Sequence, residues 1–355
     1  MKRVAIVLFN LGGPDKLESV QPFLFNLFMD PAIIGAPLPI RWVLAKLISS
    51  RRAPIAQDIY KHLGGKSPLL DLTNEQARAL ERALSALDEG LEVKAFVCMR
   101  YWHPMSAETA KDVKAFAPDE IVMLPLYPQY STSTTESSFE DWDQAAKKIG
   151  LAVPTKRICC YPIDQGWVDA QVDLLSRSME TAQNQTGGEN VRVLFSAHGL
   201  PKKLVEKKGD PYPDQVELGA DRIKTAYERK IGKPIEDGLV SYQSRVGPLE
   251  WIGPSTDDEI ERAGQDGKAL VILPIAFVSE HSETLVELDI EYKDLANEKG
   301  VSVYERVPAV GTHPAFIQGL AQLVQRARGQ SQGLCPGGDV TRKCDIKAIA
   351  CPATC

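Results

Sequence analysis

Apolar residues gather in short runs that are separated by longer amphipathic segments along most of the chain. Such a run is too continuous for a strand with one solvated face and too short to cross a membrane, so it is typical of a strand buried in a parallel sheet. The runs predict strands over residues 4–9, 93–98, 120–126, 191–197, 238–242, 270–278 and 301–307. Amphipathic spacing predicts helices over residues 21–29, 74–87, 214–230 and 313–327.

Strand and helix signals alternate, which indicates an α/β fold with helices packed on parallel sheets. Two sets of roughly four strands predict two Rossmann-like domains, each a doubly wound, four-stranded parallel sheet. We expect the first domain to comprise residues 1–128 plus about 308–330, because the last helix can return to cover it. The second comprises residues 129–307, and residues 331–355 form a cysteine-rich tail. An interdomain cleft is the expected binding site.

The stretch over residues 269–300 carries the most distinctive chemistry. A buried strand is followed by a polar turn and a helix in which Glu283, Glu287 and Glu291 are four residues apart, on one side of the helix. Its other side carries Leu285, Leu288, Tyr292 and Leu295. An acidic ridge alone is most simply a solvated face. Open α/β sheets, however, bind ligands at the carboxyl ends of strands, where His281 and Glu283 suit proton transfer or cation binding.

Another predicted strand ends at His198, before a Gly-Leu-Pro turn. A lone histidine is commonly structural. His198, however, ends a strand of the same domain as the strand that precedes the acidic ridge, so it is a candidate base facing those carboxylates. Ser196 in Ser-Ala-His does not form a nucleophile elbow, so serine hydrolase chemistry has no support. No Gly-x-Gly-x-x-Gly or P-loop motif follows a strand, so a nucleotide cofactor lacks its usual phosphate cradle.

Residues 30–54 contain several prolines and an apolar set around Ile33, Ile34, Leu38 and Ile40. Simple core contact explains the set. The alternative is an apolar lip for a flat, hydrophobic ligand, because contiguous apolar surface often marks a binding site.

The composition excludes some classes of protein. With 355 residues, 44% hydrophobic and 25% charged, the chain suffices for about two globular domains. A formal net charge of −6 and the lack of a Lys/Arg cluster argue against nucleic-acid binding. Residues 1–13 have a basic start and a short apolar run without a small-residue cleavage site, so a strand and a glycine turn explain them better than a signal peptide.

Seven cysteines are present, and four of them lie in the Gly/Pro-rich tail at Cys335, Cys344, Cys351 and Cys355. This distribution fits a reducing compartment with a local metal site better than a disulfide framework. A segment with so few apolar residues cannot order itself by burial, whereas a bound metal could order it. Zinc and [2Fe-2S] are not separated by the spacing, and a frayed tail of free thiols is the remaining alternative.

Six blocks together resemble the ferrochelatase family, whose members insert ferrous iron into a porphyrin in haem biosynthesis. They are FNLGGPD at 9–15, LYPQYSTSTTESS at 126–138, SAHGLP at 196–201, GDPYP at 209–213, YQSRVGPLEWIGPST at 242–256 and PIAFVSEHSETLVELDIEY at 274–292. They occur in the family's order over most of residues 3–325, which makes the resemblance specific.

The resemblance implies two Rossmann-like domains without a nucleotide, and a porphyrin held in the cleft. His198 matches the family's active-site histidine and Glu283 its partner carboxylate, at which the Fe²⁺ substrate is expected. The polar line that leads away from the macrocycle matches His281, Glu287 and Glu291. The residues that flank or line the porphyrin match Trp251, Tyr101 and Ile34.

This inventory fits the insertion of Fe²⁺ into protoporphyrin IX. The ring must be bent, two N–H protons must leave and water must be stripped from the metal; His198 and Glu283 would act on the protons, with Glu287 and Glu291 as a relay. One alternative is a chelatase for another porphyrin or metal, such as coproporphyrin III or cobalt. Another is a haem or metal carrier that does no chemistry.

The resemblance also implies a [2Fe-2S] cluster in the tail, because some ferrochelatases carry one near the C-terminus. In the animal enzymes one ligand comes from mid-chain, and that position is Ala170 here. The four tail cysteines could suffice, or Cys159 or Cys160 could replace one of them. The animal enzymes are membrane-associated dimers, so the resemblance allows a homodimer and a peripheral contact with the inner membrane for this chain. We expect the protein to be cytoplasmic.

Overall fold

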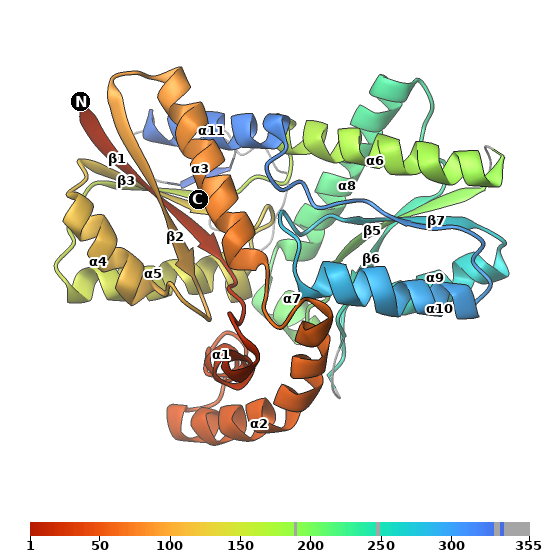
Figure 1. Ribbon diagram of the computed structural model, residues 1–355, viewed down its shortest axis with the longest axis horizontal. Coiled ribbons are helices and arrows are strands. Elements are labelled where there is room, and N and C mark those ends of the chain that lie inside the picture. The colour runs from red at the N-terminus through yellow and green to blue at the C-terminus, as the bar shows by residue number, and fades with distance from the viewer. Residues whose placement is uncertain (188–189, 246–248, 330–333, 337–355) are drawn as a thin grey trace. The chain divides into compact units, whose positions relative to one another are not determined.

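The computed structural model describes residues 1–187, 190–245, 249–329 and, for the backbone, 334–336. The chain divides into two compact units. The first contains Met1–Cys160 and the described residues of Ala321–Val340, and the second contains Tyr161–Leu320. Each unit is built on its own parallel sheet with helices on both faces (Figure 1).

The sheet of the first unit has the order β2-β1-β3-β4-β9, and all neighbouring strands are parallel. Its strands are β1 (Lys2–Asn10), β2 (Leu91–Met99), β3 (Glu120–Pro125), β4 (Thr155–Cys160) and β9 (Leu334–Pro336). Its helices are η1 (Leu17–Ser19), α1 (Val20–Phe28), α2 (Leu38–His62), α3 (Leu69–Leu87), α4 (Ser106–Phe116), the π-helix η2 (Thr132–Glu136) and α5 (Ser137–Lys148).

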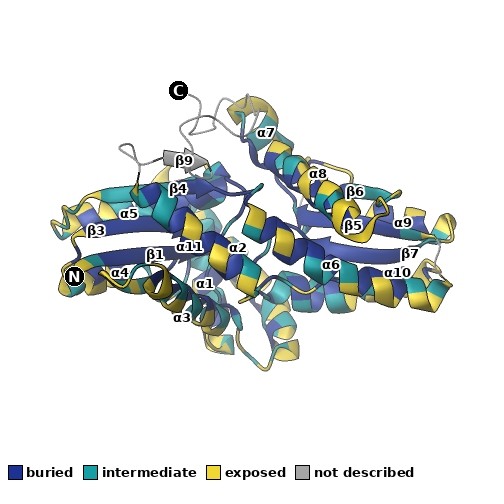
Figure 2. Ribbon diagram, turned by 90° about the horizontal axis from the view of Figure 1, so that it is seen from above, coloured by how far each residue is buried: buried dark blue, intermediate teal, exposed yellow. Residues whose placement is uncertain are grey.

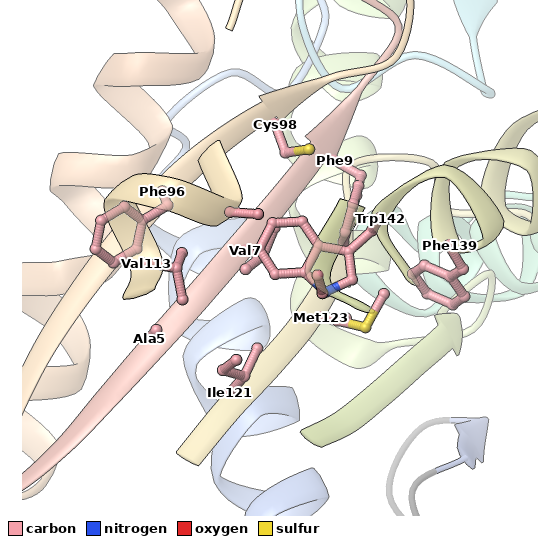
Figure 3. Packing of buried hydrophobic residues seen from close by; sticks show 12 residues of the cluster. Ala5, Val7, Phe9, Phe96, Cys98, Val113, Ile121, Met123, Phe139 and Trp142 are labelled. Atoms are coloured by element: carbon pink, nitrogen blue, oxygen red, sulfur yellow. The ribbon is translucent and has the colours of Figure 1, made fainter. Parts of the chain in front are cut away.

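Strands β1 and β3 of the first unit are buried on both sides over most of their length, as their continuous apolar runs predict (Figure 2). On one face of the sheet, side chains of α4 and α5 pack against β1, β2 and β3. Phe9 meets Phe139 and Trp142 edge to face, with ring centroids 5.5 and 6.0 Å apart (Figure 3). This packing fixes α5, and so the loop that leads into it from β3.

The sheet of the second unit has the order β6-β5-β7-β8, again with all neighbouring strands parallel. Its strands are β5 (Val191–His198), β6 (Gly238–Gln243), β7 (Ala269–Pro274) and β8 (Tyr304–Arg306). Its helices are α6 (Gln165–Thr186), α7 (Lys202–Lys208), α8 (Tyr212–Ile231), α9 (Thr256–Gln265), the π-helix η3 (Glu283–Glu291) and α10 (Tyr292–Glu298). Helix α11 (Pro314–Arg328) starts in the second unit and ends in the first.

Both sheets share one winding order. In each, the second strand in sequence lies outside the first, and the chain then crosses back to place its third strand on the other side. The order therefore reverses between β1 and β3 in the first sheet and between β5 and β7 in the second. Ligands of doubly wound folds bind beside the carboxyl ends of strands at such reversal points.

The structure confirms the predicted α/β fold with two parallel sheets and departs from the predicted elements in detail. The strand predicted over residues 270–278 ends at Pro274, because β5 pairs with it only as far as Ser196, and Phe277 N–H turns back to the Pro274 carbonyl. The buried residues that follow belong to a turn. The helix predicted after it is a π-helix over Glu283–Glu291, and strand β4 was not predicted at all.

Helix α2 leaves much of its apolar surface exposed, with Leu38, Trp42 and Val43 each more than half exposed. Of the predicted apolar set, Ile33, Leu38 and Ile40 are also exposed and Ile34 is half-buried, so simple core contact does not explain the set. In the described ranges, no helix combines the length and the apolar character that crossing a bilayer demands.

Candidate active site

His198 and Glu283 meet at the reversal point of the second sheet. His198 is the last residue of β5, and Glu283 is the first residue of η3, which follows β7 after a buried turn. Nδ1 of His198 lies 2.8 Å from Oε2 of Glu283. The imidazole is 40% exposed and the carboxylate 24%, so the pair is bonded and still reachable. Two residues that are 85 positions apart thus form a hydrogen-bonded pair at the carboxyl ends of the strands.

Each member of the pair stabilises the charged form of the other. Burial alone lowers the pKa of an imidazole, but the charge and the hydrogen bond of Glu283 outweigh it, and the pKa of His198 is raised. Burial raises the pKa of a carboxyl group, but the charge of His198 and its hydrogen bond dominate, and the pKa of Glu283 falls below its usual range. Glu283 is therefore a carboxylate at neutral pH.

Glu287 lies one turn further along η3 and is held by the residues that end β6. Ser244 donates its N–H to Oε1 of Glu287 at 2.8 Å and its hydroxyl to Oε2 at 2.5 Å. The Gln243 amide donates to the same Oε2 at 3.1 Å. Burial and the nearby charge of Glu283 raise the pKa of Glu287 to about 7. A group with this pKa exchanges protons readily at neutral pH.

Ser244 bridges the two carboxylates, because its hydroxyl also lies 3.3 Å from Oε2 of Glu283. Its backbone has a φ of +61°, a region that is uncommon for residues other than glycine. The carbonyl oxygen of the Gln243 amide accepts a hydrogen bond from the Ser196 hydroxyl at 2.7 Å, which directs the NH₂ group toward Glu287. Sequence reasoning missed these roles; the signal was polar residues directly after a buried strand.

Trp251 lies beside the strand end that carries His198. It pairs with Pro201 in an antiparallel bridge, and a side chain added at Gly199 would come within 3.0 Å of the Gln243 carbonyl and 3.4 Å of the Trp251 ring. Glycine at this position therefore lets the indole and the end of β6 pack closely on Gly199, the residue after His198.

His281 and Glu291 are placed differently from the two central glutamates. The imidazole of His281 is buried against Phe277, with ring centroids 4.5 Å apart, and burial lowers its pKa. Its Nδ1 has no hydrogen-bond partner among the described residues. The main chain of His281 accepts hydrogen bonds from Thr284 and so caps the start of η3. Glu291 is exposed at the end of η3.

Tyr101 and Ile34 belong to the first unit, where Tyr101 is only 1% exposed. Its hydroxyl donates to Oδ2 of buried Asp30 at 2.8 Å, and Arg100 donates to the same oxygen at 2.8 Å. The Ser137 hydroxyl bonds it as well. Ile34 is half-buried in the turn that Asp30 begins. A porphyrin contact by the Tyr101 hydroxyl would require this network to open.

Replacing Tyr101 with phenylalanine tests what the hydroxyl does. The change removes a donor from a buried carboxylate, so we expect the free energy of unfolding to fall by about 1.5–3 kcal/mol. The affinity for porphyrin, measured by fluorescence titration of folded protein, should not change. A loss of porphyrin affinity with unaltered stability would instead assign the hydroxyl to the ligand.

The cysteines of the predicted cluster fall largely outside the described residues. This holds for Cys344, Cys351 and Cys355, while Cys335 is described only as backbone on β9. Cys159 and Cys160 are buried on β4 with their sulfur atoms 3.4 Å apart. Over the described part of the chain, no group of three or more His, Cys, Asp and Glu side chains is arranged to hold a metal ion.

Two solved structures with a similar fold are of SirB, one of them described as a sirohydrochlorin chelatase. "SirB from Bacillus subtilis with Fe3+" superposes with a TM-score of 0.51 at 14% identity, over 94% of this chain and 100% of the other. The sirohydrochlorin chelatase SirB from Bacillus subtilis subspecies spizizenii with cobalt gives 0.50 at 11% identity, over 93% and 98%. At these identities the likeness establishes the fold alone.

Sequence comparison defines the family. The ferrochelatase family model matches residues 3–328. The chain is 53% identical to a ferrochelatase of Caulobacter vibrioides over 94% of this chain and 92% of the relative. It is 50% identical to a ferrochelatase of Pelagibacter ubique over 90% of each chain. The chain belongs to the ferrochelatase family.

Proposed function

We propose that this protein is a porphyrin metal chelatase that inserts Fe²⁺ into protoporphyrin IX, releases two protons and forms protohaem for haem biosynthesis. The bonded His198–Glu283 pair at the reversal point of the second sheet carries the proposal, together with membership of the ferrochelatase family. The reaction requires a base that can reach pyrrole N–H groups, and the imidazole of this pair is partly exposed.

The direction of the hydrogen bond determines which nitrogen of His198 reacts. Nδ1 faces Glu283, so in the neutral ring the proton sits on Nδ1 and is donated to the carboxylate, which leaves the lone pair on Nε2. Nε2 is then the atom that accepts a pyrrole proton. The imidazolium that forms is stabilised by the charge of Glu283, which lowers the cost of the transfer.

Ser244 connects the pair to Glu287 in a way that suits proton transfer. The Ser244 hydroxyl has one proton, so it donates to one carboxylate at a time. As the imidazolium passes its Nδ1 proton to Glu283, the hydroxyl can take that proton from Glu283 and release its own to Glu287, so Glu283 is left as a carboxylate. The pKa of Glu287, near 7, allows that proton to be passed on toward solvent. We place exposed Glu291 at the outer end of this relay.

Changing both Glu287 and Glu291 to glutamine tests the relay. Each amide keeps the shape of the side chain but cannot take up a proton, so turnover should slow by about tenfold or more while the Kd for porphyrin stays within twofold. The control is Glu305→Gln with Glu298→Gln, two glutamates of the same unit outside this network. Unchanged turnover in the first double variant would refute the relay.

The substrate assignment has a direct assay. Purified protein is mixed with Fe²⁺ or Co²⁺ and with protoporphyrin IX or coproporphyrin III, and metallation is followed by porphyrin fluorescence. We expect the fastest turnover with Fe²⁺ and protoporphyrin IX. Faster reaction of another pair would reassign the substrate, and tight haem retention without any metallation would indicate a carrier.

We infer that Trp251 is a wall of the porphyrin site, because it packs beside Gly199 and Pro201, which directly follow His198. Ile34 and Tyr101 are proposed as further porphyrin contacts on the family resemblance alone, and the Tyr101 ring, which is 1% exposed, would first have to become accessible. An apolar or aromatic wall can hold a flat macrocycle and use its large surface to favour the bent form that metallation needs. Trp251→Ala should raise the KM for porphyrin more than it lowers kcat.

We propose that the tail cysteines bind a [2Fe-2S] cluster, on the basis of their number, their spacing and the resemblance to cluster-containing ferrochelatases. The reaction steps above involve only side chains of the second unit and do not pass through the cluster. Visible absorption bands between about 300 and 600 nm in the purified protein would support iron and sulfide, whereas a colourless protein with bound zinc would contradict the proposal.

We also propose that α2 contacts a membrane surface peripherally. Its exposed apolar residues lie on a helix with five Lys or Arg residues and one Asp, which favours anionic lipid. Binding to anionic vesicles should exceed binding to neutral ones and should weaken when Val43 is changed to Asp. Equal sedimentation with both vesicle types would contradict the proposal. A sedimentation-velocity run on the protein without vesicles shows separately whether it is a dimer.

A further inference from the structure

The π-helix η3 needs support from outside itself. Helices with i→i+5 hydrogen bonds are rare and mostly single-turn interruptions of α-helices, often at functional sites, whereas η3 runs for nine residues. It carries Glu283 and Glu287, so its register decides where both carboxylates point. Gln243 and Ser244 hold it on one side, through the glutamates themselves.

A second set of contacts reaches η3 from β8, the edge strand of the same sheet. Arg306 donates from Nε and Nη2 to the two carboxylate oxygens of Asp289, at 2.7 and 2.6 Å. Its Nη1 donates to Oε1 of Glu280 at 2.6 Å. Glu280 lies three residues before η3 and Asp289 lies within its last turn, so one guanidinium is bonded at both ends of the helix.

Tyr304, two residues before Arg306, contacts the helix between those points. Its hydroxyl donates to the main-chain carbonyl of Leu288 at 2.6 Å. Side chains at 304 and 306 project from the same face of the strand, since successive side chains alternate. A carbonyl bonded to a tyrosine from outside is satisfied without the i→i+4 partner that an α-helix would give it.

These contacts fix the rotation of η3 about its axis. Asp289 is two residues after Glu287 and therefore projects from the opposite side of the helix. Holding Asp289 on β8 keeps Glu287 turned toward Ser244 and Glu283 toward His198. We infer that Arg306 and Tyr304 are positioning residues that hold η3 in its π register and so keep the two glutamates aligned with His198.

The guanidinium is not a site for an anionic ligand. The Arg306 side chain is only 12% exposed and already faces two carboxylates. The cluster of Arg306, Glu280 and Asp289 therefore carries a net negative charge, which would repel an anion. The bonds of the guanidinium are directed at the helix rather than at solvent. Positioning is the role that this arrangement leaves for it.

Arg192 provides a matched control within the same sheet. It lies near the start of β5, its side chain is 6% exposed, and it also bonds two carboxylates, those of Asp237 and Asp266. Arg192→Gln and Arg306→Gln therefore remove the same kind of double ion pair. They differ in which structure the pair holds, since Asp237 and Asp266 lie outside η3.

The kinetic part of the test rests on the proposed function and compares the two variants well below their melting temperatures. We expect Arg306→Gln to lower kcat for Fe²⁺ insertion about ten- to a hundredfold with little change in the KM for porphyrin, because small displacements of reacting groups have effects of this size. Arg192→Gln should lower the melting temperature comparably and leave kcat within twofold. Equal kcat values for the two variants would overturn the inference.

Hydrogen–deuterium exchange tests the same inference without reference to activity. Amides of residues 283–291 should exchange faster in Arg306→Gln than in wild type or in Arg192→Gln, and Tyr304→Phe, which removes one oxygen atom, should show a smaller increase in the same segment. If the wild type does not metallate porphyrin, the proposed function fails and exchange alone decides. Unchanged exchange over residues 283–291 in both Tyr304→Phe and Arg306→Gln would overturn the inference. If the arginine variants do not fold, unchanged exchange in Tyr304→Phe alone would overturn it.

Discussion

Replacing His198 with alanine is expected to lower kcat for Fe²⁺ insertion by about 10²–10⁴-fold, the range over which a positioned general base contributes. The change removes the nitrogen that accepts the pyrrole proton and leaves Glu283, whose pKa is low, as a poor substitute. The imidazole is 40% exposed and not part of the core, so the fold should persist. The measurement is steady-state metallation with porphyrin at saturation.

A second histidine–glutamate pair supplies the control. His103 lies 2.7 Å from Glu108, and both side chains are about half exposed on the first unit. His103→Ala removes the same chemical group from the same kind of pair but leaves the reversal point of the second sheet intact. It should keep wild-type turnover. A His198→Ala variant as active as His103→Ala would remove the base from the proposed mechanism.

Changing Glu283 to glutamine is expected to lower kcat by about a hundredfold and to shift the pH dependence of the reaction. The Gln side-chain carbonyl can still accept a hydrogen bond from Nδ1–H, so the imidazole ring of His198 should stay in place. The lost charge no longer favours the imidazolium, so the pKa of His198 falls from its raised value. A base is active when deprotonated, and activity therefore rises with pH through its pKa.

The rising limb of kcat/KM against pH should consequently move to lower pH in Glu283→Gln, even though the maximum is lower. Glu108→Gln, the counterpart in the surface pair, should leave both the limb and the maximum unchanged. A limb that stays in place or moves to higher pH in Glu283→Gln would show that His198 is not the group titrating there.

The sequence was informative where burial pattern and chain order decide the structure. Continuous apolar runs define parallel strands, and the carboxyl ends of such strands share one edge. That reasoning alone placed His198 and Glu283 at the same edge of the second sheet, where the structure bonds them. It also predicted two sheets, because the strands fall into two sets of roughly four, each with its own helices.

The rest depended on contacts that periodicity does not encode. The spacing of Glu283, Glu287 and Glu291 is compatible with an α-helix, and the π register follows from bonds to β8, a three-residue strand. Ser244 bridges two carboxylates only because its backbone adopts a left-handed conformation, which a serine rarely does. Tyr101 follows a strand end, like a ligand contact, yet it is buried on Asp30.

The central claim is that the imidazole of His198 takes a proton from the porphyrin. Single-turnover metallation by His198→Ala, with porphyrin bound beforehand and free imidazole added, tests it most directly. We predict that the rate increases with imidazole concentration and follows the neutral form of imidazole as the pH changes, while His103→Ala shows no such response. A His198→Ala variant that metallates bound porphyrin at the wild-type rate without imidazole would contradict the claim.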